Sequence, residues 1–167
     1  TTKMLSTYEA GDSLEDVTGP LGRPSEFANG KWGVIGGGVG LAIAFPITRK
    51  LVKDGKDVHA IMGARTKGLL LLEDQFRSIL PDDRIHITTD DGSYGEKGVV
   101  TAPEERLLKA GDIDHIFCVG PVPMMKFSTL TAEKYNCPIT ASLNPIMVDG
   151  TGMCGCCRVE VDGKTKF

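Results

Sequence analysis

The sequence has 167 residues, of which 25% are charged, and a formal net charge of −3. The slight acidic excess and the lack of basic blocks argue against binding to nucleic acid or to an anionic membrane surface. Short apolar runs, broken by glycine or charge, predict neither a membrane-spanning helix nor a secretory signal. Three of the five cysteines fall within four residues, which suits a metal site in a reducing compartment and predicts a cytoplasmic location.

From residue 31 onward, apolar segments alternate with helical patterns. The apolar segments predict five strands, at residues 32–36, 57–62, 84–89, 113–119 and 138–143. The intervening patterns predict helices at residues 39–54, 69–79, 102–110 and 122–135. Strands that are separated by helices join through right-handed crossovers. We therefore expect an α/β fold with a five-stranded parallel sheet and helices on both faces.

The two ends of the chain depart from this alternation. Residues 1–28 are polar and read as a lead-in from an upstream segment. Near the other end, Asp162-Gly163 is a strong two-residue turn signal and predicts a hairpin that is entering its second strand at Phe167. We therefore expect a fragment of a longer protein.

Glycines are concentrated between the first predicted strand and the first predicted helix. Glycines at this point let the backbone approach a pyrophosphate, and the N-terminus of the following helix favours its charge. The spacing departs from G-x-G-x-x-G, so a tight turn that needs positive φ is the alternative. The predicted pyrophosphate-binding residues are Gly36, Gly37, Gly38, Val39 and Gly40.

A second candidate follows the fourth predicted strand. Ligands of open parallel sheets bind beyond the carboxyl ends of the strands, and Gly120-Pro121 would turn the chain there. Cys118 would then lie near the ligand, with a small buried hydrophobe as the alternative. Pro123 and Met124 open the next helix and are further candidates, although a methionine at this point also suits a core.

The loops after the second and third predicted strands supply charged candidates. Arg65 could reach a phosphate or stack on a ring, and a solvated charge is equally consistent with its position. Asp90 and Asp91 belong to a loop of small polar residues that could line the adenosine side of a nucleotide site. Taken alone, that loop is more typical of an ordinary polar connection.

The most specific motif is the thiol-rich segment at residues 149–157. Plant-type [2Fe–2S] proteins use the spacing C-x4-C-x2-C and a fourth cysteine further on. Cys154 and Cys157 supply the second pair, Asp149 stands where the first cysteine belongs, and no cysteine follows Cys157. The pattern predicts most of an iron–sulfur site with these three residues as ligands. A zinc site or free thiols are the alternatives.

In order and spacing these motifs resemble one group in the ferredoxin–NADP reductase superfamily. The group contains the small electron-transfer subunits of dihydroorotate dehydrogenase, of sulfide dehydrogenase and of NADH-dependent ferredoxin:NADP oxidoreductase. The motifs that carry the resemblance lie at residues 19–22, 36–40, 63–65, 90–95, 120–125, 142–145 and 148–158. The resemblance places Asp149 with the second and third types, because the dihydroorotate dehydrogenase subunits have cysteine at the matching position.

The resemblance implies a division of the chain into three parts. Residues 1–28 would be the end of an FAD-binding β-barrel, residues 29–143 an NAD(P)-binding domain, and residues 144–167 the start of a [2Fe–2S] domain. NAD(P)H would pass a hydride to FAD, and electrons would reach a larger catalytic subunit of a hetero-oligomer through the cluster. The fragment alone would be inactive, because most of the barrel and the fourth cluster ligand lie outside it.

The resemblance also assigns roles within the nucleotide domain. Gly120, Pro121 and Cys118 would frame the nicotinamide. Asp90 and Asp91 disfavour a 2′-phosphate, whereas Arg65 would accept one, and we expect NADH to be preferred. The alternatives are a dihydroorotate dehydrogenase subunit, a hydrogenase-associated diaphorase subunit, and a zinc-stabilised nucleotide-binding domain without a redox role.

Overall fold

A computed structural model describes residues 2–22, 24–143 and 146–166. The chain divides into two compact units. The larger unit is formed by residues 26–144, and the smaller one by the terminal segments 1–25 and 145–167. No helix among the described residues combines the length and apolar character that crossing a bilayer requires.

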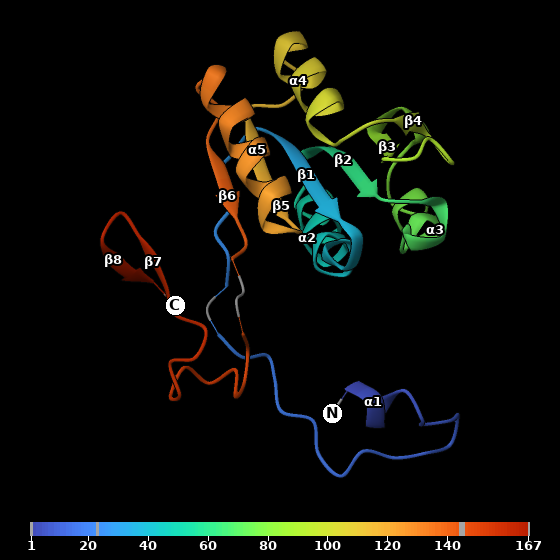
Figure 1. The fold of residues 1–167 in the computed structure, drawn as a ribbon, viewed down its shortest axis with the longest axis vertical. Coiled ribbons are helices and arrows are strands. Elements are labelled where there is room, and N and C mark those ends of the chain that lie inside the picture. The colour runs from blue at the N-terminus through green and yellow to red at the C-terminus, as the bar shows by residue number, and fades with distance from the viewer. Residues whose placement is uncertain (1, 23, 144–145, 167) are drawn as a thin grey trace. The chain divides into compact units, whose positions relative to one another are not determined.

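The larger unit is built on a six-stranded sheet in which every pair of neighbours is parallel (Figure 1). The strands are β1 (Lys31–Gly37), β2 (Asp57–Ala64), β3 (Ile85–Thr89), β4 (Glu96–Lys97), β5 (His115–Val119) and β6 (Ile139–Ala141). Their order across the sheet is β4-β3-β2-β1-β5-β6. The order reverses direction between β1 and β5, and such a switch point is where ligands of open α/β sheets bind.

The five predicted strands are confirmed, but the prediction of five strands in total is wrong. The sixth strand, β4, has two exposed residues, and Glu96 pairs with Thr88 at the edge of the sheet. Its sequence has no apolar residue and lies between Gly95 and Gly98. A strand this short and polar leaves no periodic signal, so only its pairing with β3 identifies it.

Four helices connect the strands of the larger unit. They are α2 (Leu41–Lys53), α3 (Glu73–Arg77), α4 (Thr101–Ala110) and α5 (Val122–Lys134). The predicted helix at residues 69–79 shrinks to the five residues of α3, because Leu70 is extended and Leu72 has a φ of 61°. Pro46 lies inside α2, which begins only after a 3₁₀ turn at Gly38–Gly40.

Both faces of the sheet are buried by helices, as predicted. Successive strand residues point to opposite faces, so Val34 packs with Leu41 of α2 in one core cluster. Its neighbour Ile35 packs in a second cluster with Leu107 of α4 and Met125 of α5. Burial on both sides explains why the strands read as continuous apolar runs rather than as alternating patterns.

The smaller unit contains little regular structure. A short helix, α1 (Thr2–Leu5), begins it, and an antiparallel pair, β7 (Val159–Val161) and β8 (Lys164–Lys166), lies near its other end. Asp162 and Gly163 join this pair with φ values of 51° and 68°, as the favoured two-residue hairpin turn requires. The predicted hairpin is therefore confirmed.

Candidate functional site

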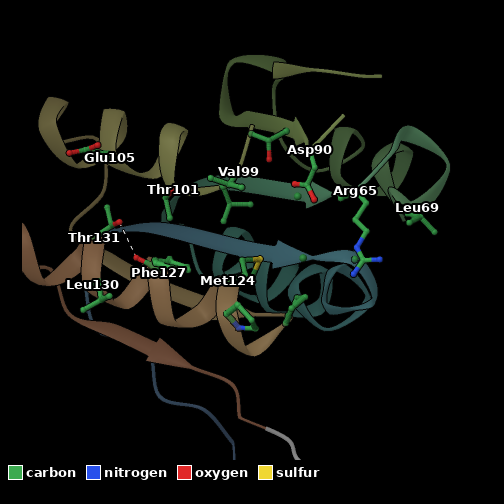
Figure 2. A pocket seen from close by; sticks show the side chains of 18 of the residues that line it. Arg65, Leu69, Asp90, Val99, Thr101, Glu105, Met124, Phe127, Leu130 and Thr131 are labelled. Atoms are coloured by element: carbon green, nitrogen blue, oxygen red, sulfur yellow. Dashed lines mark hydrogen bonds between the residues drawn. The ribbon is translucent and has the colours of Figure 1, made fainter. Parts of the chain in front are cut away.

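A cavity of about 1160 Å³ opens in the larger unit at the carboxyl ends of β1, β2 and β3. The ends of these strands contribute Gly37, Gly38, Gly63, Ala64 and Thr88 to its wall. From there the cavity continues along α5 opposite the first turns of α4. Figure 2 shows Arg65 and Asp90 toward one end, Glu105 and Leu130 toward the other, and Met124 between them.

The glycine turn after β1 brings two stretches of backbone close together. A Cβ atom on Gly120 would lie 3.1 Å from the Cα atom of Gly37, and one on Gly37 would lie 2.4 Å from Sδ of Met124. Side chains at these positions would therefore collide with the end of β1 or with α5. Gly38 differs, because its φ is 54° and no atom lies within 4 Å of where its Cβ would be. The backbone at Gly38 is thus bare toward the open space of the cavity.

The helical N-terminus at this turn has no side-chain cap. Neither Gly37, which precedes the 3₁₀ turn, nor Gly40, which precedes α2, provides a capping side chain. Uncapped N–H groups at a helix start carry partial positive charge and bind anions such as phosphate. Since Gly38 lines the cavity, this turn could hold a phosphate at the cavity wall.

The loops at the Arg65 end of the cavity are tied to each other. The backbone N–H of Lys67 donates to Oγ of Ser93 at 2.9 Å, and the Lys67 ammonium lies 4.6 Å from the centre of the Tyr94 ring. The Tyr94 hydroxyl in turn donates to Glu73 at 2.7 Å. These contacts engage the Lys67 charge within the loops, and Arg65 is the cation from this segment that lines the cavity.

The structure gathers seven of the predicted nucleotide-binding residues around this one cavity. They are Gly37, Gly38, Arg65, Asp90, Pro121, Pro123 and Met124. They come from four separate segments of the chain, and the parallel sheet brings these segments to one edge. The roles of these residues stay a prediction, which their common location supports.

Three predicted residues of the glycine turn lie elsewhere. Gly36 and Gly40 instead allow close packing. A Cβ atom on Gly36 would lie 2.7 Å from Cδ2 of Leu41, and one on Gly40 would lie 2.4 Å from the carbonyl oxygen of Val119. The Val39 side chain is 78% exposed and does not line the cavity. Gly120 likewise contributes through its approach to Gly37 rather than as part of the wall.

Asp91 is also not among the residues that line the cavity. Its Oδ1 accepts the backbone N–H of Ser93 at 2.9 Å. Hydrogen bonds from Ser93 hold the pKa of Asp91 below its usual value. Of the two acidic residues in this loop, Asp90 is the one that faces the cavity.

Cys118 does not reach the cavity. Its side chain is 0% exposed and belongs to the core cluster beneath α4 and α5. Burial raises the pKa of the thiol to about 12, Ser128 opposes the shift, and the nearby Glu104 adds to it. The position matches the alternative of a small buried side chain, and the predicted place beside a nicotinamide finds no support in the cavity wall.

The part of the α5 wall that follows Met124 was not predicted from the sequence. Phe127 and Leu130 are 59% and 44% exposed, and Val99 faces them from the segment before α4 (Figure 2). Thr131 and Lys134 extend the same helical stripe. Their spacing of three and four residues is detectable in the sequence, but the same spacing is typical of a face buried in the core.

The thiol-rich segment of the smaller unit is less assembled. Asp149 accepts backbone N–H groups from Thr151 at 2.9 Å and from Cys154 at 3.0 Å, and these bonds lower the pKa of its carboxyl. Cys154 and Cys157 are free thiols. Within the described residues, no three Cys, His, Asp or Glu side chains are grouped to hold a metal ion. Their role as ligands of a cluster therefore stays a prediction.

Comparison with known proteins gives relatives over the whole chain. No model of a protein family matches. A dihydroorotate dehydrogenase B (NAD(+)) electron transfer subunit homolog from Thermotoga maritima is 49% identical over 168 residues, which cover 100% of this chain and 58% of that protein. A probable electron transfer subunit of the same enzyme from Methanocaldococcus jannaschii is 36% identical, over 97% of this chain and 62% of its own length. The chain thus spans about three fifths of these relatives.

Solved structures extend the comparison to the fold. A chain of an NADH-dependent reduced ferredoxin-NADP oxidoreductase matches with a TM-score of 0.85 and 48% identity, over 100% of this chain and 60% of that one. The C-terminal domain of a hydrogenase from Pyrococcus furiosus matches 75% of this chain with a TM-score of 0.59. At 22% identity, the second similarity shows the fold alone.

The parallel sheet with helices on both faces is therefore a ferredoxin reductase-like fold. The chain itself is homologous to proteins named as electron transfer subunits of dihydroorotate dehydrogenase B and to a chain of an NADH-dependent reduced ferredoxin-NADP oxidoreductase. The resemblance inferred from the motifs is confirmed.

Proposed function

We propose that this chain is the NAD(P)H-binding module of a flavin and iron–sulfur oxidoreductase. The observation that carries the proposal is the cavity at the carboxyl ends of β1, β2 and β3, with a bare glycine turn in its wall. That position is where open parallel sheets bind nucleotides. The relatives also support the proposal, because proteins of similar sequence are named as electron transfer subunits.

The cavity suggests how a dinucleotide would lie. Its pyrophosphate would meet the uncapped N–H groups at Gly38, where open space surrounds the backbone. Adenosine would extend toward Arg65 and Asp90, and the nicotinamide toward Pro121 and Met124. In this arrangement the protein binds and orients the nucleotide, and the nucleotide supplies the hydride when it is bound.

We further propose that NADH is preferred over NADPH. The Asp90 carboxylate lines the cavity near the proposed adenosine side and would repel a 2′-phosphate. The Arg65 guanidinium opposes this effect, so the preference is expected to be moderate. Lys67 contributes less to phosphate binding, because its ammonium is engaged with Tyr94.

For the whole protein we propose a flavin and iron–sulfur activity, in which FAD would supply hydride acceptance and a [2Fe–2S] cluster, held in part by Asp149, Cys154 and Cys157, would supply electron transfer to a larger partner subunit. The support is the resemblance of the motifs and the relatives' name of electron transfer subunit. The chain's own share in this activity is nucleotide binding. A dihydroorotate-oxidising partner is the second candidate, favoured by the names of the relatives and opposed by Asp149. Isolation of the protein with such a partner would decide in its favour.

The test is a fluorescence titration of the protein with NADH and with NADPH under identical conditions. Saturable binding of both nucleotides, with the lower dissociation constant for NADH, is expected. Clearly tighter NADPH binding would reverse the assigned preference. Failure to bind either nucleotide would contradict the proposed function.

A further inference from the structure

Three polar side chains lie buried beneath the α4–α5 wall of the cavity, and nucleotide binding does not use them. Glu104 comes from α4, Ser128 from α5 and Cys118 from β5, and each is 0% exposed. Within the part of the chain that the structure describes, neither Glu104 carboxyl oxygen nor Ser128 Oγ has a hydrogen-bond partner. Buried polar groups of this kind are rare and costly, so their presence here calls for a reason.

The surroundings favour the neutral form of the Glu104 carboxyl. Burial raises the pKa of Glu104 to about 8, the nearby Ser128 hydroxyl opposes the shift, and Glu105 adds to it. The thiols of Cys118 and Cys137 face the same region from β5 and from the segment before β6, and burial raises the pKa of both. Among these described neighbours, which are acids, thiols and a hydroxyl, there is no cation to stabilise an ionised carboxylate.

Glu104 and Ser128 belong to the two helices, α4 and α5, that form walls of the cavity. Thr101 and Glu105, one turn before and one residue after Glu104, line the cavity on the α4 side. On the α5 side, Phe127 lies one residue before Ser128 and also lines the cavity. A change in the separation of Glu104 and Ser128 would therefore move both walls at once.

We propose that Glu104 is a positioning residue for the cavity. With its proton in place, the carboxyl is neutral, and α4 and α5 can pack around it at the width that a nucleotide requires. Loss of the proton leaves an unpaired charge between the helices and separates the walls. This inference rests on the proposed function, because nucleotide affinity reports the width of the cavity.

The first test measures the NADH dissociation constant from pH 6.5 to pH 9.5 for the wild type and for Glu104→Gln. Glutamine keeps the size and hydrogen-bonding capacity of a neutral carboxyl but cannot ionise in this range. The control is Glu133→Gln, the same substitution at an exposed position of α5. All three proteins are compared by the ratio of their dissociation constants at pH 9 and pH 7.

We expect this ratio to be about ten in the wild type. The protonated fraction of Glu104 falls from about ten in eleven at pH 7, one unit below its pKa, to about one in eleven at pH 9, one unit above it. The Glu104→Gln protein should have a ratio near one, and the control should follow the wild type. Parallel profiles for the wild type and Glu104→Gln would overturn the proposal.

A second readout needs no nucleotide. Hydrogen exchange of the α4 and α5 amides, corrected for the intrinsic effect of pH, should be faster at pH 9 than at pH 7 in the wild type only. Equal protection in the wild type and Glu104→Gln at both values would also overturn the role of Glu104. Absence of NADH binding in every variant would instead contradict the proposed function, and the exchange result would still decide about Glu104.

Discussion

Two regions of this chain carry predicted chemistry, and the chain assembles them to different degrees. In the larger unit, the cavity wall is supplied by strand ends and by helices whose inner faces are fixed in the two core clusters. In the thiol-rich segment at residues 149–157, the Asp149 carboxylate is bonded to its own loop. The described donors there do not come together as a group of three.

The difference shows that the specificity of a motif and the preassembly of its site are separate properties. The register of a parallel sheet places the backbone groups of a nucleotide site, so such a site forms as the domain folds. Ligands on a loop are gathered by the metal itself, because binding free energy is coupled to the ordering of the loop. The most specific motif of this sequence is accordingly the one that the polypeptide alone assembles least.

The largest expected effect is a pH-dependent loss of stability of the larger unit, caused by Glu104. Its pKa is about 8 in the folded protein, above the unfolded value of about 4.5, so folding favours the protonated form. Stability from this group is therefore full below about pH 4.5 and is lost as pH rises toward 8. Relative to Glu104→Gln, the wild type should lose about 3 kcal/mol of unfolding free energy between pH 5 and pH 8.

Urea unfolding at a series of pH values measures this difference. The Glu133→Gln protein serves again as the control for an exposed change of charge. If the wild type and Glu104→Gln lost stability in parallel over this range, Glu104 would not be a protonated core residue.

The next largest effect concerns the glycine turn. Gly38→Ala places a methyl group in the open space where we propose that the pyrophosphate binds. Loss of one or two charge-assisted hydrogen bonds should weaken NADH binding by about tenfold or more. The matched control is Gly55→Ala, because Gly55 also has a positive φ, 73°, and open space beside it, but lies outside the cavity wall.

Both alanine substitutions should destabilise the fold by a similar amount, about 1 kcal/mol, because each forces a side chain into the left-handed region. Titration with NADH separates binding from this shared cost. Equal losses of affinity in the two variants would remove the glycine turn from the proposed site.

A smaller effect is expected from Asp90. In Asp90→Asn the repulsion of a 2′-phosphate is removed, and the affinity for NADPH relative to NADH should rise about fivefold, or about 1 kcal/mol. The control is Asp91→Asn, the same change at a carboxylate that is bonded to Ser93. A larger shift of preference at Asp91 than at Asp90 would contradict the assigned adenosine side.

The smallest effect is expected from the thiol-rich segment. Replacing Cys154 and Cys157 by serine should change the NADH dissociation constant by less than about twofold, because these residues and the cavity belong to different units. The same titration measures this change. A loss of affinity similar to that of Gly38→Ala would mean that the two regions are not independent.

Sequence patterns predicted the part of the fold that depends on long apolar runs. They missed β4, which is two exposed residues long, and they extended α3 across Leu72, whose left-handed backbone depends on its tertiary surroundings. The wall of the cavity was predicted where a turn needs glycine, as at Gly38. It was not predicted where exposure decides, because the stripe with Phe127 has the same spacing as a buried face.

Cys118 is the opposite case, a residue that was predicted to lie near the ligand but is buried in the core. Both faces of β5 are apolar, so the sequence alone does not reveal which way the thiol points. The structure directs it into the cluster shared with α4 and α5, away from the cavity. Side-chain direction in a strand that is buried on both faces depends on packing rather than on pattern.

The most direct test of the central claim is a residue-resolved NMR titration of the chain with NADH. The account predicts saturable shifts in the amide resonances of Gly37, Gly38, Arg65 and Asp90, and unchanged resonances at residues 149–157. Unperturbed resonances at the glycine turn under saturating NADH would contradict it.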